Sequence, residues 1–494
     1  SNAEEFRRQY LNAFCIEGYL DFSFSANFKI FTSLASGCVF FYKKASKDII
    51  SKNNIQHLVL RPNIFLEYLN IFALEKNDIK LISQQLLIDN DWAWKVFLYG
   101  NVLDFHFMKR LFSDKDNFCS LDNFMAENKI FSGAGFIRGE KDRKYKVDVL
   151  RQYKVVETAK NQNKFYRFFI DIDNLKYFSD IYHDDDYFHD LGRIEAYKAP
   201  HLLVKRAIND FPVVAYTDSD CIFPNTVFGF AGIENATIIK YLGSLFSTNI
   251  FSYLLFMSSS QWGIERPEVI LDEYRKTSVP QQINSTLFNK IVEKFDKISV
   301  TSKNCFQNLF NNGDVLINDF LAEMNAIFAD LYGIENIEKD LIDFTVNISI
   351  PAYRSMEKRM ETFNSPDELR EYCNIFLETF NALLEKQGKS LRAEVFNNYY
   401  FTAVNFIIER GISHPGFICR DDLEVQKILN KLGNLSLSKI GPLFIHKEIR
   451  GFQDDSFYII KTNERRNWHP AIARLDLSEV MENIHQNELE RNAL

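Results

Sequence analysis

The hydrophobic residues change their spacing along the chain, and this change restricts the folds that the chain can adopt. Between residues 151 and 285, short apolar runs of strand length are separated by turn residues, as in Phe165–Asp173. Residues 286–400 instead repeat their apolar positions every three or four residues, which is typical of amphipathic helices. One regular architecture cannot hold both patterns, so the sequence predicts a mixed α/β, multi-domain protein.

Length and turn-residue content set the number and the character of the domains. The 494 residues suffice for roughly two to four domains of ordinary size. Only 19 residues are Gly and 11 are Pro, about half of the usual share, so long flexible linkers are not expected. We predict a remnant of an α/β sheet at 4–50, a helical connector at 51–150, an α+β domain at 151–285, a largely helical domain at 286–440 and a strand–helix tail at 441–494.

The N-terminal segment predicts that the chain begins inside a domain. A helix followed by a buried strand is expected twice within residues 4–50, which suits the edge of an α/β sheet. A sheet remnant of that length is too short to close by itself. Ser1, Asn2 and Ala3 resemble a residual expression tag, so we expect the natural part to start at Glu4 and to continue a domain whose earlier part lies upstream.

The clearest helix signals lie at residues 365–388. Ser365 is placed as the N-cap, Pro366 as the first helical residue and Glu368 as the partner in a capping box, while Gly388 ends the helix. Further helices are expected from an N-cap at Asp314 to Gly333, at Asp91–Leu111 with a break at Gly100, and at Ala236–Ser259, and strands are expected at Cys38–Tyr42, His201–Val204, 211–216 and Phe457–Ile460.

Charge and cysteine content narrow the classes of function. Lys and Arg number 58 against 66 Asp and Glu, and the net charge of −8 excludes a uniformly basic nucleic-acid coat but not a local basic cleft. The seven cysteines are scattered without a CxxC pair, which predicts a reducing cytoplasm and no zinc ribbon. No apolar run approaches the roughly 18 residues of a membrane helix, so no membrane span is expected.

The usual catalytic motifs are missing from the sequence. It contains no Gly-rich phosphate loop of the GxxxxGK[ST] type and no GxSxG nucleophile turn. Phe131–Glu140 includes Gly133 and Gly135 but no third glycine at the required spacing, so we expect a plain turn there rather than a cofactor loop. No cysteine has a neighbouring histidine in the sequence with which it could form a nucleophile pair. We therefore assign no catalytic residue.

The run His183–Asp190 is the densest group of potential metal ligands. Its carboxylates could hold a hard cation such as Mg²⁺, but their spacing matches no standard site, and a solvated acidic loop is the simpler interpretation. We assign no metal site. A metal-dependent enzyme that uses Asp184, Asp185, Asp186 and Asp190 stays a separate hypothesis.

Basic and aromatic side chains gather at three places where they could contact a nucleic acid. Lysine and arginine bind phosphates, and amide and guanidinium groups hydrogen-bond to base edges. An ordinary charged surface is the simpler alternative for each group by itself. The predicted DNA-binding residues are Arg193, Lys198, Lys205 and Arg206 in the first group, Gln261, Trp262 and Arg266 in the second, and Arg465 and Arg466 in the third.

Several segments together carry a resemblance to a known family. KAPHLLVKR (Lys198–Arg206) and its sequel FPVVAYTDSDCIFPNTVFGFAG resemble the opening of a target recognition domain, and EVILDEYRKTSVP (Glu268–Pro280) resembles its end. EEFRRQYLNAFCIEGYLDFS, near the N-terminus, is similar to the last part of a methyltransferase domain, downstream of the catalytic NPPY motif. The chain thus resembles the C-terminal half of bacterial adenine-specific DNA methyltransferases of restriction-modification systems, including the type IIG (type IIS-like) enzymes.

This resemblance implies a target recognition domain at 151–285 that binds double-stranded DNA in the cytoplasm. The full-length enzyme would methylate adenine with S-adenosylmethionine as cofactor, and would use Mg²⁺ if it also cleaves DNA. The glycine-rich cofactor motif and NPPY are both missing from this sequence. The resemblance therefore implies no cofactor in this chain and no catalysis by it alone, no membrane contact and no particular oligomeric state.

A function of a different class stays open beside that one. The acidic net charge and the ordinary helices also suit a non-catalytic helical scaffold or protein-interaction module with no DNA role. Salt separates the two functions, because binding to DNA phosphates weakens steeply as salt rises, whereas an apolar protein interface does not.

Overall fold

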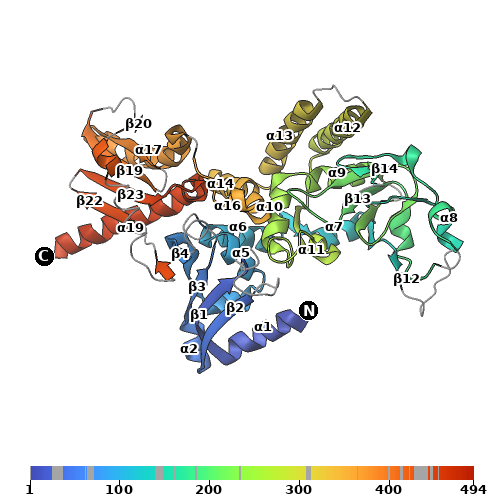
Figure 1. Cartoon of the computed structure of the whole chain (residues 1–494), viewed down its shortest axis with the longest axis horizontal. Coiled ribbons are helices and arrows are strands. Elements are labelled where there is room, and N and C mark those ends of the chain that lie inside the picture. Colours follow the sequence, from blue (N-terminus) through green and yellow to red (C-terminus); the bar gives the residue numbers. More distant parts are fainter. Residues whose placement is uncertain are drawn as a thin grey trace. The chain divides into compact units, whose positions relative to one another are not determined.

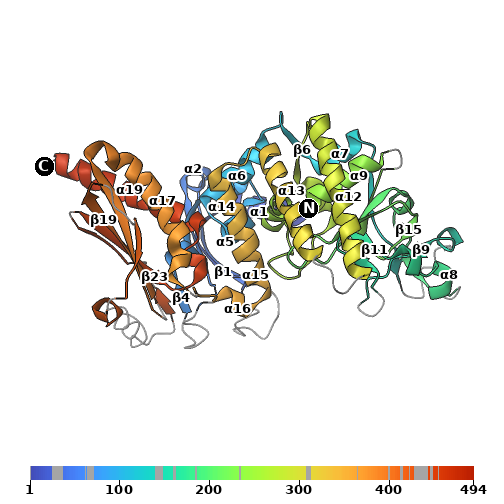
Figure 2. The same ribbon diagram turned by 90° about the horizontal axis from the view of Figure 1, so that it is seen from above.

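The chain forms two compact units in the computed structural model (Figures 1 and 2). Unit 1 combines Ser1–Asn101 with Lys339–Leu494, and unit 2 is Val102–Glu338. Both units contain sheets and helices, which confirms the mixed α/β, multi-domain class. The structure describes residues 2–24, 37–61, 63, 72–139, 148–159, 163–183, 186–232, 235–307, 313–363, 365–398, 401–411, 416–421, 423–427, 443–445, 449–453 and 455–493.

A four-stranded sheet in the order β2-β1-β3-β5 forms the N-terminal part of unit 1. β1 pairs antiparallel with β2 and parallel with β3. The expected strand at Cys38–Tyr42 is β2, but Val39, Phe41 and Tyr42 are exposed because this strand has only one neighbour among the described strands. The elements here are α1 (Asn2–Ala13), β1 (Phe14–Phe22), β2 (Gly37–Lys44), α2 (Lys47–Lys52), β3 (Asn54–Val59), β4 (Phe72–Leu74), β5 (Ile79–Ser83), α4 (Gln84–Asp89) and α5 (Ala93–Tyr99).

A five-stranded sheet in the order β20-β18-β19-β23-β22 forms the C-terminal part of unit 1. Alternate residues such as Val404 and Phe406 point to one face, which α17 and α19 cover (Figure 2). Three of its strands lie within 286–440, so the prediction of a largely helical segment is wrong for Lys389–Asn397, Phe401–Arg410 and Phe417–Cys419. The elements are α14 (Asn336–Phe344), α15 (Ile350–Arg354), α16 (Met356–Arg359), α17 (Arg370–Leu384), β18 (Lys389–Asn397), β19 (Phe401–Arg410), β20 (Phe417–Cys419), β21 (Leu443–Ile445), β22 (Ile449–Gln453), β23 (Ser456–Thr462) and α19 (Pro470–Ala493).

The capping signals around residue 365 form the contacts that the sequence predicts. The Ser365 hydroxyl accepts a hydrogen bond from the Asp367 N–H at 3.3 Å, and the Glu368 carboxylate accepts one from the Ser365 N–H at 3.2 Å. The first turn is a 3₁₀-helix that continues into α17. Gly388 follows with φ of 65°, a backbone conformation that glycine adopts without strain.

A buried ionic cluster joins the two chain segments of unit 1. Arg466 donates to Glu464 at 2.8 Å and lies 3.4 Å from both Glu75 and Asp78, and Arg61 forms an ion pair with Asp78 at 3.0 Å. Burial alone would lower the pKa of Arg466, but the three surrounding carboxylates raise it. The guanidinium of Arg466 therefore stays charged and links the N-terminal and C-terminal parts of the unit.

An antiparallel sheet in the order β14-β13-β16-β7 lies at the centre of unit 2. Both faces of this sheet are covered. On one face, Leu203 packs into a core that includes helix α8 (Phe178–Ile181) and the 3₁₀ turns, and on the other face Leu202 lies close to Gly243 of helix α9 (Ala236–Phe246). The strands are β6 (Phe118–Ser120), β7 (Phe131–Ala134), β8 (Ile137–Arg138), β9 (Lys154–Val155), β10 (Phe165–Tyr166), β11 (Phe169–Ile170), β12 (Phe188–Asp190), β13 (His201–Lys205), β14 (Val214–Thr217), β15 (Cys221–Ile222), β16 (Val227–Ala231) and β17 (Ser278–Pro280).

The helices of unit 2 follow the predicted pattern with two differences, one split helix and one shifted start. The expected helix at Ala236–Ser259 is two helices, because Thr248 interrupts it and caps the second by accepting from the Phe251 N–H at 3.3 Å. Gly100 separates α5 from α6, as predicted. The helices are α6 (Val102–Ser113), α7 (Leu121–Glu127), α8 (Phe178–Ile181), α9 (Ala236–Phe246), α10 (Asn249–Ser258), α11 (Leu271–Lys276), α12 (Ser285–Gln307) and α13 (Gly313–Leu331), the last beginning one residue before the expected N-cap.

The ionic cluster of unit 1 generates a stability prediction. Replacing Arg466 by Met should lower the free energy of unfolding of unit 1 by about 3–5 kcal/mol, because buried carboxylates lose their counter-charge. Chemical denaturation followed by tryptophan fluorescence measures this, since three of the four tryptophans lie in unit 1.

The adjacent arginine provides the matched control. Arg465 is about half exposed and lies 3.8 Å from Glu361, so Arg465→Met should change the same free energy by no more than about 0.5 kcal/mol. Equal effects of the two substitutions would show that the cluster does not stabilise the unit.

Candidate functional site

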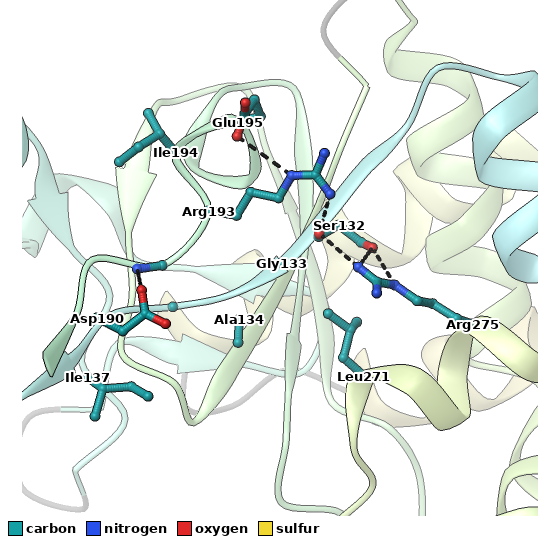
Figure 3. A pocket seen from close by; sticks show the side chains of 12 residues that line it. Ser132, Gly133, Ala134, Ile137, Asp190, Arg193, Ile194, Glu195, Leu271 and Arg275 are labelled. Carbon is teal, nitrogen blue, oxygen red and sulfur yellow. Dashed lines mark hydrogen bonds and ion pairs between the residues drawn. The ribbon is translucent and has the colours of Figure 1, made fainter. Parts of the chain in front are cut away.

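An open pocket of about 620 Å³ lies beside strand β7 in unit 2 (Figure 3). Three segments line it: β7 with the residues that follow it, the end of β12 with the loop and 3₁₀ turn after it, and α11. Figure 3 shows the side chains of Arg193 and Arg275 reaching Ser132 from two sides. We take this pocket as the candidate functional site because cationic groups from separate segments meet in it.

Ser132 accepts hydrogen bonds from both arginines. Arg275 donates from Nη2 to the Ser132 hydroxyl at 3.0 Å and to its carbonyl oxygen at 3.2 Å, and from Nε to the hydroxyl at 3.2 Å. Arg193 donates from Nη1 to the same carbonyl oxygen at 3.3 Å. Hydrogen bonds from charged donors are about twice as strong as neutral ones, so β7, α11 and the segment after β12 are tied at one point.

Glycines permit the close packing behind the pocket. A Cβ atom at Gly133 would lie 2.5 Å from the Cβ of Arg193, and one at Gly229 would lie 2.6 Å from the Ala196 carbonyl oxygen. Both distances are too short for any side chain. The 3₁₀ turn Ile194–Tyr197 therefore rests directly on the backbones of β7 and β16, and its position is fixed by contact.

The charges that line the pocket are balanced. Arg193 and Arg275 face Asp190 and Glu195, and the nearest oppositely charged atoms of Arg193 and Glu195 are 3.6 Å apart. The side chains of both these residues are about half exposed. Asp190 accepts a hydrogen bond from the Gly192 N–H at 3.0 Å and so shapes the loop. The pocket thus presents hydrogen-bond donors and acceptors side by side rather than a single sign of charge.

The first group of predicted DNA-binding residues is spread around the central sheet. Arg193 lies in the pocket, whereas Lys198 donates to Asp220 at 2.9 Å and to the Tyr153 hydroxyl at 2.7 Å, which raises its pKa. Arg206 forms an ion pair with Glu268 at 3.0 Å. A phosphate would have to replace the carboxylate partner of each of these cations.

Lys205 differs from its neighbours in the first group. Its ammonium donates to Asn163 Oδ1 at 3.1 Å and lies 5.1 Å from the centre of the Phe165 ring. Among the described residues, no carboxylate lies within 4 Å of it. Burial lowers the pKa of Lys205. Because its partner is an amide oxygen and not a carboxylate, a phosphate could pair with it without displacing an acid.

In the second predicted group, the expectation that Trp262 is open to DNA is wrong. Trp262 is fully buried, with its ring packed edge-on against Phe256 at 5.2 Å, so no face of it is open for a base to stack on. Gln261 is partly buried. Its backbone carbonyl oxygen accepts hydrogen bonds from backbone N–H groups of the turn that follows, including the N–H of Ile264. Arg266 is well exposed beside Glu265 at 3.7 Å. The loop therefore offers one accessible cation, and Trp262 belongs to the core.

The third predicted group lies in unit 1 and also needs a correction. Arg466 is enclosed by three carboxylates in the ionic cluster, so its guanidinium serves the fold and is not open to a phosphate. Arg465 is about half exposed.

The structure brings together a cysteine and a histidine that the sequence keeps apart. The Cys221 Sγ lies 3.4 Å from His201 Nε2, and the Ala196 carbonyl oxygen lies 2.9 Å from His201 Nδ1. Both side chains are fully buried. Burial raises the pKa of the Cys221 thiol and lowers that of His201, so the pair is a neutral packing contact and not an activated nucleophile.

The described residues contain neither a cluster of metal ligands nor a helix that could span a membrane. Within those ranges, no three His, Cys, Asp or Glu side chains gather as metal ligands. Asp184 and Asp185 of the metal hypothesis lie outside the described residues, and Asp186 forms an ion pair with Arg138. Across the part of the chain that the structure describes, no helix is long and apolar enough to cross a membrane.

Sequence reasoning missed most of the pocket. Ser132, Glu195 and Arg275 were not predicted, because each looks like an ordinary polar residue in its own segment, and Asp190 was considered only as a metal ligand. The available signal was the glycine spacing in Phe131–Glu140, since closely spaced glycines allow another backbone to approach.

The comparisons with known proteins include a weak likeness to a solved structure. No family model matches the sequence, and no curated protein matches it. Among solved structures, the type IIG restriction endonuclease BpuSI aligns with a TM-score of 0.26 and 9% sequence identity over 67% of this chain. The aligned part is 45% of that chain, so the present chain spans less than half of the length of that enzyme. At this TM-score, the function has to be inferred from the site itself.

The close packing at Gly133 generates a second stability prediction. Gly133→Ala should lower the free energy of unfolding of unit 2 by about 1–3 kcal/mol, because the new methyl group forces the 3₁₀ turn away from β7. Gly37→Ala is the control, since a Cβ there meets nothing within 4 Å among the described residues. A Gly133→Ala protein as stable as the wild type would show that the turn is not held against the strand.

Buried His201 generates a pH prediction. Its folded-state pKa lies below the ordinary value of about 6.5, so the unfolded chain takes up a proton first as the pH falls. The contribution of His201 to the free energy of unfolding of unit 2 should therefore be complete above about pH 6.5. Below that pH, the free energy of unfolding should decrease as the pH is lowered. Urea denaturation of the wild type and of His201→Gln at several pH values measures this, and an equally steep decrease in both would contradict it.

Proposed function

We propose that this chain is the DNA sequence-recognition portion of a restriction-modification enzyme and that unit 2 binds duplex DNA. One observation carries this proposal: the segments that resemble a target recognition domain lie together in unit 2. Lys198–Arg206 and its sequel supply β13, β14 and β16, and Glu268–Pro280 supplies α11 with Arg275. The pocket with its two arginines lies where these segments meet β7.

The proposed division of labour follows from the surroundings of each cation. Lys205 has no carboxylate partner among the described residues, and Lys198 and Arg206 each have one that a phosphate can replace. These three residues are proposed to bind phosphates, which sets the position of the protein on DNA but reads no sequence. Arg193 and the pocket are proposed to face the bases.

Catalysis is proposed to belong to a part of the full-length enzyme outside this chain. The sequence has neither the glycine-rich cofactor motif nor NPPY, so S-adenosylmethionine and any Mg²⁺ would be bound elsewhere in that enzyme. The modified adenine would be turned out of the base stack, because an enzyme cannot reach the reacting atom within a duplex. This chain would then determine where on the DNA the adenine is methylated or the DNA is cut.

Binding of the full chain to a fluorescent duplex tests the proposal. The affinity should fall steeply between roughly 50 and 200 mM salt, because phosphate contacts release counterions. The double variant Lys205→Ala, Arg206→Ala should bind all duplex sequences more weakly by a similar factor and should show a flatter salt dependence. Fluorescence anisotropy over a range of salt concentrations measures both effects.

A lysine outside the predicted set provides the control. Lys297 on α12 is about half exposed and paired with Glu293 at 2.6 Å, so Lys297→Ala removes a comparable surface charge. It should leave affinity and salt slope unchanged. Unchanged affinity in the double variant would mean that the assigned phosphate contacts are wrong.

One observation favours the scaffold function as a second candidate. Val39, Phe41 and Tyr42 are exposed on β2, a strand with one neighbour among the described strands of unit 1. Exposed apolar residues on such a strand suit pairing with another protein. Absence of duplex binding even at low salt would favour this second function over the first.

A further inference from the structure

We infer that Arg193 and Glu195 together read one G·C base pair through the major groove. This inference rests on the DNA binding proposed above and names what the pocket recognises. It concerns Glu195, in the 3₁₀ turn Ile194–Tyr197, and Arg193, the N-cap of that turn. Of the two, only Arg193 was among the predicted DNA-binding residues.

The hydrogen-bonding groups of the pair are open on one side. Arg193 uses Nη1 toward Ser132 and Nε toward Glu195, and its Nη2 has no partner among the described residues. Glu195 faces Arg193 with Oε2 at 3.6 Å, and its Oε1 likewise has no partner among them. Both side chains are about half exposed at the mouth of the pocket.

A G·C pair matches this order of donors and acceptors. In the major groove, guanine presents two acceptors, N7 and O6, and the paired cytosine presents the N4 amino donor beside them. The two hydrogens of the Arg193 Nη2 can donate to the two acceptors, and the Glu195 carboxylate accepts from the amino group. Arg193 next to Glu195 therefore complements G·C, whereas an A·T pair would place its adenine amino donor against the guanidinium.

The charge balance of the pocket favours a base edge over a phosphate. Two arginines and two carboxylates line it, so its net charge is zero, and the carboxylates would repel a phosphate. The nearby Asp122 and Asp272, at 3.9 and 3.4 Å from Arg275, add negative charge. A neutral edge with paired donors and acceptors meets no such repulsion.

The backbone that carries Arg193 and Glu195 is also held firmly enough for these side chains to discriminate between base pairs. Gly133 lets the Arg193 Cβ rest on β7, and the buried Tyr197 closes the turn by donating from its hydroxyl to the Leu191 carbonyl oxygen at 2.8 Å. Gly192 precedes the pair with φ of 71°. Because the backbone is anchored on both sides, the side chains cannot follow a mismatched base at low cost.

Selection from a library of duplexes with a randomised centre tests the inference, with sequencing of the fraction bound by the full chain. The wild type should enrich a G·C pair at one or more positions. Arg193→Gln should change one of these to A·T, because glutamine pairs with adenine N6 and N7. Glu195→Ala, which leaves the Arg193–Ser132 bond in place, should lower the preference for G·C at the same position by about five-fold or more.

A second arginine–glutamate pair serves as the matched control. Glu5 and Arg8 on α1 are 2.6 Å apart, about as exposed as the pocket pair, and lie outside unit 2 and outside the predicted DNA-binding residues. Arg8→Gln and Glu5→Ala should leave the selected sequence unchanged. A wild-type preference that neither pocket variant alters, with melting temperatures unchanged, would overturn the inference while leaving DNA binding intact. Failure of the wild type to bind any duplex would instead overturn the proposed function.

Discussion

The shared contact at Ser132 holds the candidate site together. Arg193 and Arg275 come from segments far apart in the sequence, and both donate to the backbone of this one strand residue. Hydrogen bonds to a charged partner contribute about 1.5–3 kcal/mol each, which is enough to fix a short helix and a 3₁₀ turn against a sheet edge. The pocket lies between these two segments, because each of them is bonded to the same strand.

In each unit, arginines link segments that are distant in the sequence. How completely the guanidinium is enclosed decides whether the arginine can also bind a ligand. In unit 1, Arg466 is surrounded by Glu75, Asp78 and Glu464, and every side of its guanidinium is committed to the fold. In unit 2, Arg193 makes a backbone hydrogen bond and an ion pair and lies over the Phe131 ring, at the mouth of an open pocket. A cation that keeps an open side can meet a ligand, so the same residue type stabilises one unit and is proposed to recognise DNA in the other.

Local sequence signals predicted individual elements well and their partners poorly. The capping residues around Ser365 and the break at Gly100 act within a few residues, so their effect can be read directly. The strands β18, β19 and β20 were missed, because they follow a well-marked helix and their place in a sheet depends on pairing with one another and, for β19, with the distant β23. Trp262 looked available for stacking, but its exposure depends on Phe256 and the surrounding core.

The sequence by itself determined the mixed class of the protein, the positions of its marked helices and the lack of known catalytic motifs, since these follow from composition and short-range spacing. Only the tertiary structure decided which charged side chains can still bind a ligand. Whether Arg193, Arg466 or Lys205 can meet a ligand depends on carboxylates and carbonyl groups brought close by folding, and electrostatic interaction acts on distance in space. For the same reason Glu195, an unremarkable surface residue in the sequence, becomes half of a donor–acceptor pair in the folded pocket.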